Sequence, residues 1–314
     1  MGEKDVSEKM LEAYNDVFAD IVNVLLFGGE EVIKPEELTE HSARAAYKAD
    51  GKIRDIERDV SKYWNKENIR IACIGIENQT NPDPYMPLRV LAYDAAEYRA
   101  QLNRQENGKN PVFPVVTMVL YFGCEKRRNG PKNLLNCVDI PEKFRPYVND
   151  YRINLYEIAY LDMETVSRFK SDFRIVADYF VQKRLDHDYK PSRIRMKHIE
   201  EVLHLMSVMT GDRRYEEALN ESNTEKGETD TMCEILEQVE RRGWERGEKL
   251  GLERGKEIGK EIGKEIGKEI GILEGRDEAL RLMEYLYAHD RTADIGKVLK
   301  DAEYRDRLFK ELGI

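Results

Sequence analysis

Acidic and amide side chains near two predicted strands have the types and spacing of a metal-dependent site. Glu77 and Gln79 directly follow the apolar run Ile69–Ile76, and alternate residues of a strand point to the same side. Asp59 lies upstream in a charged segment that we expect to be extended. If that segment is the adjacent strand, Asp59 and Glu77 meet at the edge of the sheet. Two carboxylates and a strand carbonyl suit Mg²⁺, which prefers oxygen ligands.

A further acidic pair lies on a predicted N-terminal helix. Apolar residues recur at spacings of three and four from Ser7 to Phe27, which predicts one amphipathic helix ending at Gly28-Gly29. Asp16 and Asp20 are four residues apart and therefore share a face of that helix. Because charged residues make up 36% of the chain, the alternative reading of these acidic residues is a solvated surface.

The elements that position these residues predict an α/β domain with a central mixed sheet. Runs rich in β-branched and aromatic residues predict buried strands at 69–76, 112–122 and 153–161. Helices are predicted at 86–102, 164–182 and 192–210. We assign residues 1–218 to this domain, 219–230 to a polar linker and 231–314 to a helical C-terminal region.

Composition excludes several classes of protein. There are 51 basic and 61 acidic residues, so the net charge is −10, which excludes a domain that is basic overall. No apolar stretch approaches the roughly 20 residues of a membrane span, and the N-terminus lacks the apolar core of a signal peptide. The four cysteines include no CxxC pair. We therefore expect a cytoplasmic protein with reduced thiols, without a membrane partner.

The stretch from Ile76 to Tyr93 resembles the signature of the recombination-promoting nuclease and putative transposase family. It reads Ile-Glu-Asn-Gln-Thr-Asn-Pro-Asp-Pro-Tyr-Met-Pro-Leu-Arg-Val-Leu-Ala-Tyr, where the family typically has Ile-Glu-His-Gln-Ser, then Pro-Asp, then Met-Pro-Leu-Arg and a tyrosine. Residues 114–123 resemble the family's Pro-Val-x-x-x-Val-Leu-Tyr-x-Gly. The family belongs to the PD-(D/E)XK nuclease superfamily, which implies a restriction-endonuclease-like mixed sheet flanked by helices.

The resemblance assigns roles to the acidic residues. It implies that Asp59 and Glu77 are ligands of Mg²⁺, with Mn²⁺ as a possible substitute, and that Asp16 or Asp20 is the helix acid that completes the site. Gln79 stands where the superfamily usually has a catalytic lysine, as in this family's own Glu-x-Gln variant.

The sequence departs from the family pattern at several points. Asn78 replaces the usual histidine, and no proline precedes Asp59. Glutamine carries no positive charge, so charge stabilisation would come from the metal, Arg89 or Lys62. We assign Arg89 and Lys62 to DNA contacts, while structural pairing of Arg89 with an acid is the alternative.

The function that this resemblance implies is a Mg²⁺-dependent DNA endonuclease, which hydrolyses phosphodiester bonds and is associated with recombination or mobile elements. Two alternatives stay open. One is a catalytically weak or inactive accessory protein that keeps the nuclease fold and binds DNA or a partner. The other is a toxin-like defence nuclease.

Glycine recurs at every fourth position from 243 to 275, and Gly-Lys-Glu-Ile is repeated from Gly255 to Ile270. On a helix, each glycine lies about 40° from the last, and each costs about 1 kcal/mol relative to alanine. A parallel isoleucine stripe would offset this cost by burial against another helix; it comprises Ile258, Ile262, Ile266 and Ile270. We therefore predict a homo-oligomerising element, with a passive spacer as the alternative.

Overall fold

The computed structural model contains a five-stranded mixed sheet in the order β1-β4-β5-β6-β7. Its strands are β1 (Leu38–Glu40), β4 (Val60–Lys66), β5 (Ile69–Gln79), β6 (Val115–Tyr121) and β7 (Asn154–Glu157). The pairs β1–β4 and β4–β5 are antiparallel, whereas β5–β6 and β6–β7 are parallel. A separate antiparallel hairpin consists of β2 (Arg44–Ala49) and β3 (Lys52–Glu57). The prediction of an α/β domain with a mixed sheet is confirmed.

The structure describes nearly the whole chain. The described residues are 3–41, 44–49, 52–57, 59–67, 69–104, 111–186, 189–191, 193–221 and 231–313. They divide into two units, Met1–Glu240 and Arg241–Ile314.

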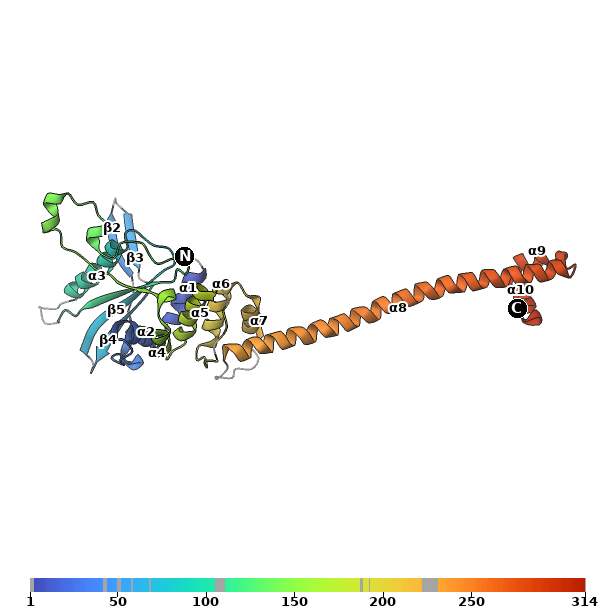
Figure 1. The fold of residues 1–314 in the computed structure, drawn as a ribbon, viewed down its shortest axis with the longest axis horizontal. Coiled ribbons are helices and arrows are strands. Elements are labelled where there is room, and N and C mark those ends of the chain that lie inside the picture. Colours follow the sequence, from blue (N-terminus) through green and yellow to red (C-terminus); the bar gives the residue numbers. More distant parts are fainter. Residues whose placement is uncertain are drawn as a thin grey trace. The chain divides into compact units, whose positions relative to one another are not determined.

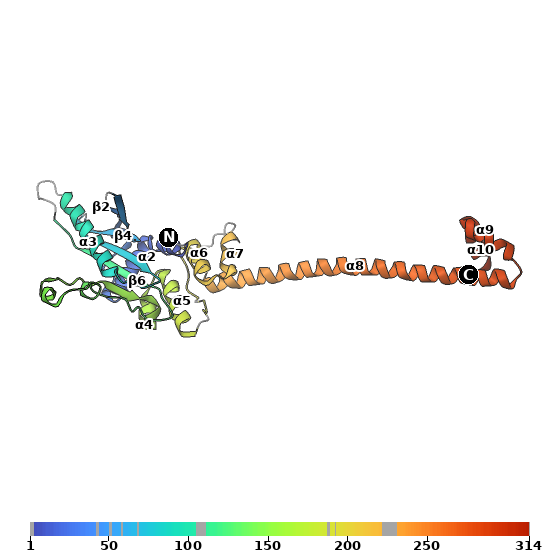
Figure 2. The same cartoon turned by 90° about the horizontal axis from the view of Figure 1, so that it is seen from above.

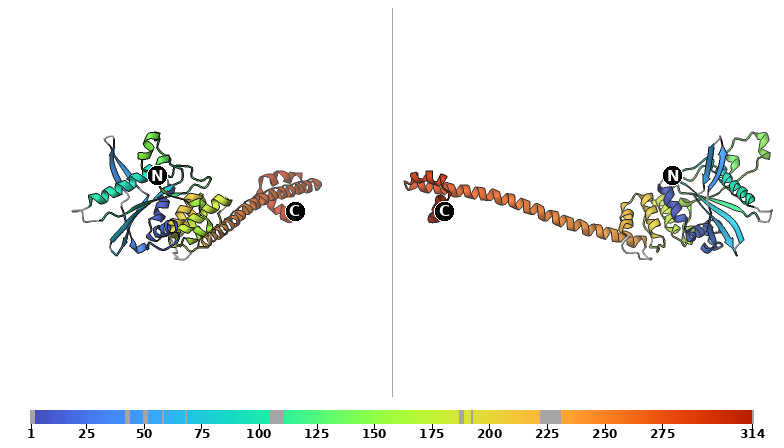
Figure 3. Two further views of the ribbon diagram at one scale, coloured as in Figure 1. Left: turned by 60° about the vertical axis from the view of Figure 1, so that its left-hand side comes forward. Right: turned by 180° about the vertical axis from the view of Figure 1, so that it is seen from behind.

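Helices cover both faces of the sheet (Figures 1 and 2). The helices of the first unit are α1 (Glu3–Glu12), α2 (Asn15–Phe27), α3 (Met86–Asn103), α4 (Met163–Arg168), α5 (Phe173–Asp186), α6 (Ile199–Thr210) and α7 (Arg213–Glu221). Alternate side chains of β5 and β6 point to opposite faces of the sheet, and this decides which helices they contact. Ile74 and Ile76 belong to the main core with α2 and α5, whereas Val119 of β6 packs with Met86 and Val90 of α3 on the other face. Figure 3 shows these layers from two further sides.

Two predicted helices are each divided in the structure. The segment from Ser7 to Phe27 breaks between α1 and α2, where Tyr14 has an extended backbone. Its side chain contacts residues that are distant in the sequence: its hydroxyl donates to Glu201 at 2.5 Å, and its ring stacks on His198. The segment 164–182 breaks between α4 and α5, where the Asp172 carboxylate accepts hydrogen bonds from the backbone of Lys197 and His198. Tertiary contacts thus override the local helical pattern.

Smaller differences concern the ends of elements. The strand predicted at 153–161 stops at Glu157 and continues as a 3-10 turn, Ile158–Tyr160. The helix predicted at 192–210 begins only at Ile199. Of the predicted linker, residues 219–221 close α7, and 222–230 lie outside the described residues.

The second unit is helical, as predicted for the C-terminal region. Its elements are α8 (Met232–Ala288), whose first turns belong to the first unit, α9 (Thr292–Lys300) and α10 (Ala302–Leu312). The last turns of α8 pack against α9 and α10 around Leu282, Leu286, Val298 and Leu308. Met232, Leu236 and Val239, at the start of α8, belong instead to the core of the first unit. No helix among the described residues combines the length and the apolar character that crossing a membrane requires.

Candidate functional site

The register of β4 and β5 places Asp59 beside Glu77. Val60 pairs with Ile76 in this antiparallel pair, so the residue before Val60 and the residue after Ile76 lie opposite each other at the end of the ladder. The Asp59 carboxylate also accepts a hydrogen bond from the backbone N–H of Asn78 at 2.7 Å. Glu77 is only 3% exposed. The register therefore places Asp59 and Glu77 opposite each other on neighbouring segments.

Each of these carboxylates has a cationic neighbour. Lys9 of α1 pairs with Asp59, with 2.7 Å between Nζ and Oδ1. Arg89 of α3 pairs with Glu77, and it also donates to Asp83 and to the Tyr93 hydroxyl at 3.0 Å each. Burial opposes the charge of Arg89, but the Glu77 carboxylate outweighs it and raises the pKa of Arg89 above its ordinary value. Arg89 thus lies at the site and pairs with acids there.

Gln79 lies two residues beyond Glu77 and is bound to a cation that sequence reasoning missed. Its Oε1 accepts from Nε of Arg128 at 3.2 Å. The other guanidinium nitrogens of Arg128 donate to the carbonyls of Pro131 and Asp83, each at 2.9 Å. Arg128 is 4% exposed, and burial lowers the pKa of Arg128, although arginine stays protonated in proteins. A fixed positive charge therefore lies beside Gln79.

Lys62 lies on the other face of the sheet. Because it is three residues from Asp59 along an extended segment, the two side chains alternate to opposite sides. The ammonium group donates to Asn15 at 2.7 Å and pairs with Glu40, and the side chain is fully buried. The structure does not bring Lys62 to the Glu77 face, and this corrects the placement expected from the sequence.

Asp16 and Asp20 also lie away from Asp59 and Glu77. Asp16 pairs with Lys197 at 2.8 Å and His198 at 3.0 Å. Burial opposes the ionised form, but these hydrogen bonds prevail and lower the pKa of Asp16. Asp20 accepts from the backbone N–H groups of residues 170 and 171, while burial raises its pKa. These two acids connect α2 to the segments that flank α5, so neither is placed as the expected helix acid.

An acidic residue that does lie near Asp59 is Glu12 of α1. Its Oε2 accepts from the side-chain amide of Asn78 at 2.7 Å. Its second oxygen and the amide oxygen of Asn78 are buried and have no hydrogen-bond partner among the described residues. Burial raises the pKa of Glu12 well above its ordinary value, and the nearby Glu8 and Asp59 charges add to the effect. The available signal was the acidic spacing of four at positions 8, 12, 16 and 20.

The donor atoms around Asp59 fit a hard cation. Glu12, Asp59 and Asn78 offer oxygen ligands on the α1 side of β5, whereas the Glu77 carboxylate lies on the α3 side, beside Arg89. The second carboxyl oxygen of Glu12 and the amide oxygen of Asn78 are buried and lack hydrogen-bond partners among the described residues. Mg²⁺ is bound through one or two carboxylates together with waters. These residues therefore supply the type of ligand atom that Mg²⁺ takes.

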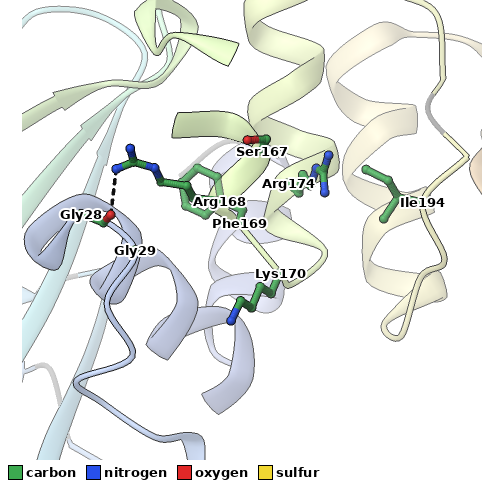
Figure 4. Close-up of a pocket in the computed structure, with 8 residues that line it drawn as sticks. All are labelled: Gly28, Gly29, Ser167, Arg168, Phe169, Lys170, Arg174 and Ile194. Atoms are coloured by element: carbon green, nitrogen blue, oxygen red, sulfur yellow. Dashed lines mark hydrogen bonds between the residues drawn. The ribbon is translucent and has the colours of Figure 1, made fainter. Parts of the chain in front are cut away.

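A separate cleft of about 560 Å³ lies between α2 and the segment joining α4 to α5 (Figure 4). It is lined by Gly28, Gly29, Ser167, Arg168, Phe169, Lys170, Arg174 and Ile194. Arg168 donates to the Gly28 carbonyl at 2.8 Å and pairs with Glu164, and Lys170 pairs with Glu31. None of the residues assigned to the site from the sequence lines this cleft, so the acidic group stays the stronger candidate.

Comparison with known proteins finds a family match for part of this chain. Residues 67–208 match the family model described as putative transposase, YhgA-like, which confirms the resemblance to the recombination-promoting nuclease and putative transposase family. The matched segment contains Glu77, Gln79, Arg89 and Arg128, whereas Asp59 and Glu12 precede it. No curated protein and no solved structure matches the chain.

Proposed function

We propose that this chain is a Mg²⁺-dependent endonuclease that hydrolyses DNA phosphodiester bonds. The proposal starts from the match of residues 67–208 to the YhgA-like putative transposase family, which relates the chain to mobile elements. The observation that supports this most is the juxtaposition of Asp59 and Glu77 at the ends of β4 and β5. Glu12 and Asn78 add further oxygen atoms on the Asp59 side of this pair.

Some residues of the site would bind the metal, and others would contact the phosphate or orient water. Asp59 and Glu77 would hold Mg²⁺, for which Mn²⁺ would substitute, with Glu12 near Asp59. The bound ion would activate water and polarise the phosphate. Arg89, whose side chain is 44% exposed, is the cation that we assign to a DNA phosphate. Gln79 is fixed by Arg128 and would orient water without carrying charge.

Nicking of a supercoiled plasmid in the presence of Mg²⁺ tests the proposal. We expect Glu77→Gln and Asp59→Asn to lower the rate at least about 100-fold, because each removes a carboxylate from the metal site while nearly preserving its shape. Glu164→Gln is the matched control, since this exposed carboxylate of α4 pairs with Arg168 and should leave the rate unchanged. Equal nicking by the wild type and both site variants would refute the assignment.

A second candidate is a DNA-binding or partner-binding accessory protein that does not cut. The observation that favours it is the neutralisation of Asp59 by Lys9 and of Glu77 by Arg89, together with an amide in place of the usual lysine. Calorimetric titration separates the two functions. The nuclease requires heat of Mg²⁺ binding that Glu77→Gln diminishes, whereas DNA binding without Mg²⁺ binding supports the accessory role.

We also propose that α8 associates with a second copy of this chain. Ile258, Ile262, Ile266 and Ile270 are 48–57% exposed in the single chain. A Cβ added at any of the α8 glycines would meet no atom within 4 Å apart from the adjacent backbone of α8 itself, so the glycine stripe leaves room for a close helix. Burial of the isoleucines would offset the helical cost of the glycines.

A further inference from the structure

A second cluster of potential ligands lies beneath α3, and it differs in chemistry from the acidic group. It consists of His41, Cys73 and Glu97, whose ligand atoms all lie within 4.8 Å of one another. Nε2 of His41 is 2.9 Å from Oε2 of Glu97. The cluster is buried, because Cys73 is 0% exposed and the side chains of His41 and Glu97 are 9% and 5% exposed.

Three separate elements bring these residues together. His41 follows β1, and its backbone N–H donates to Ser61 of β4 at 3.2 Å. Cys73 lies on β5, where it pairs in register with Tyr63. Glu97 lies on α3, two helical turns beyond Arg89. Cys73 and Glu77 therefore lie on one face of β5, and Glu97 and Arg89 lie on one helix, but the two sites use different residues.

Neighbouring side chains orient the cluster in the way that supporting residues orient metal ligands. The second oxygen of Glu97 accepts from the Tyr63 hydroxyl at 3.2 Å, and Arg104 donates to that hydroxyl at 2.8 Å. The rings of Tyr63 and His41 lie 4.2 Å apart. Glu97 is thus held by one oxygen while the other faces His41, so the carboxylate is preorganised toward the cluster.

We propose that His41, Cys73 and Glu97 bind a Zn²⁺ ion. A thiolate, an imidazole and a carboxylate are the ligand types that Zn²⁺ takes, whereas Mg²⁺ takes oxygen ligands. Three protein ligands leave the fourth tetrahedral position to a water molecule. Binding releases the proton of the Cys73 thiol and any proton on His41 to solvent, because both ligands must be unprotonated. The ion would join the end of β1, β5 and α3 independently of the nuclease activity.

Titration of the metal-free full-length protein with Co²⁺ tests the site through its absorption spectrum. Tetrahedral thiolate coordination gives a sulfur-to-cobalt band in the near ultraviolet and visible bands of the metal. We expect these bands to saturate at one equivalent and to disappear on addition of Zn²⁺. Cys73→Ser should lose the near-ultraviolet band, while Cys137→Ser should keep it, because Cys137 lies in another part of the fold with its thiol on the Leu134 carbonyl.

A second measurement covers the case in which Cys73→Ser does not fold. Glu97→Gln retains the thiol and should weaken Co²⁺ binding at least about 10-fold, and Zn²⁺ should raise the melting temperature of the wild type more than that of this variant. Identical bands in Cys73→Ser would overturn the proposal. So would a wild type that shows neither the bands nor a Zn²⁺-dependent melting temperature, since the cluster would then be a hydrogen-bonded trio only.

Discussion

The side-chain amide of Asn78 donates a hydrogen bond to the buried carboxyl group of Glu12, with 2.7 Å between the two atoms. The backbone N–H of Asn78 donates at the same time to Asp59. One residue at the end of β5 thus links α1 to the segment that enters β4. The family resemblance has histidine at this position, so the asparagine is part of how this chain arranges its acidic group.

Replacing Glu12 by glutamine should stabilise the fold and weaken metal binding. The wild-type carboxyl group is buried near Glu8 and Asp59, whereas an amide of the same shape carries no charge and can still accept from Asn78. We expect the melting temperature at neutral pH without metal to rise by roughly 2–4 °C, which corresponds to about 1 kcal/mol, and the calorimetric heat of Mg²⁺ binding to fall. Glu31→Gln is the exposed control, and a lower melting temperature for Glu12→Gln would contradict this account.

Arg128→Lys should destabilise the protein although the charge is kept. Lysine cannot reproduce the guanidinium fork that reaches Gln79, Pro131 and Asp83, so buried acceptors lose their donors. We expect the free energy of unfolding in urea to fall by about 1–3 kcal/mol, and plasmid nicking to slow as well. The neighbouring substitution Arg127→Lys, at a side chain 68% exposed, should change neither. Equal effects of the two substitutions would count against the role of Arg128.

The ion pairs of Asp16 predict a pH-dependent contribution to stability. Burial opposes ionisation, but the hydrogen bonds from Lys197 and His198 lower the pKa of Asp16 in the folded state. The unfolded chain therefore takes up the proton first, so the stabilisation is present above about pH 4 and is lost as the pH falls. Asp16→Asn should cost a few tenths to about 1 kcal/mol at pH 6. Urea unfolding should show this difference shrinking toward pH 3, and a constant difference would contradict the prediction.

Sedimentation of the full chain tests self-association of α8. Truncation after Glu240 keeps the first turns of α8, whose Met232, Leu236 and Val239 complete the core of the first unit. We expect the full chain to form a dimer or larger oligomer at micromolar concentration and the truncated chain to be a monomer.

Substitution of the four repeat isoleucines by glutamine should have the same effect as truncation, because each buried isoleucine contributes roughly 1.5–3 kcal/mol. Substitution of the repeat lysines at 256, 260, 264 and 268 by glutamine is the matched control and should leave the oligomer intact. A monomeric full chain would make the tail a spacer.

The parts of the fold that were predictable depend on local pattern. The β-branched run before Glu77 predicted β5, and the expectation of an adjacent strand predicted that Asp59 and Glu77 lie at the same end of neighbouring segments. Alternation also decides the position of Lys62, which is an odd number of residues from Asp59 and so lies on the opposite face. That parity is readable from the sequence alone.

The parts that were not predictable depend on contacts between distant segments. The break at Tyr14 follows from its contacts with Glu201 and His198, and this break separates Glu12 from Asp16. Arg128 lies in a segment without periodic pattern, 49 residues from Gln79. Propensity and spacing describe neighbours along the chain, so they could not indicate this pair or the cluster beneath α3.

The continuity of α8 makes its length adjustable in fixed steps. At about 1.5 Å per residue, one Gly-Lys-Glu-Ile unit lengthens the helix by about 6 Å and rotates its end by about 40°. Gain or loss of whole units would therefore change the reach of the helix while glycine and isoleucine stay in their stripes. Insertion of a single residue would instead rotate everything beyond it by about 100° and divide the isoleucine stripe. Variation in whole units is thus the form of length change that this helix can absorb.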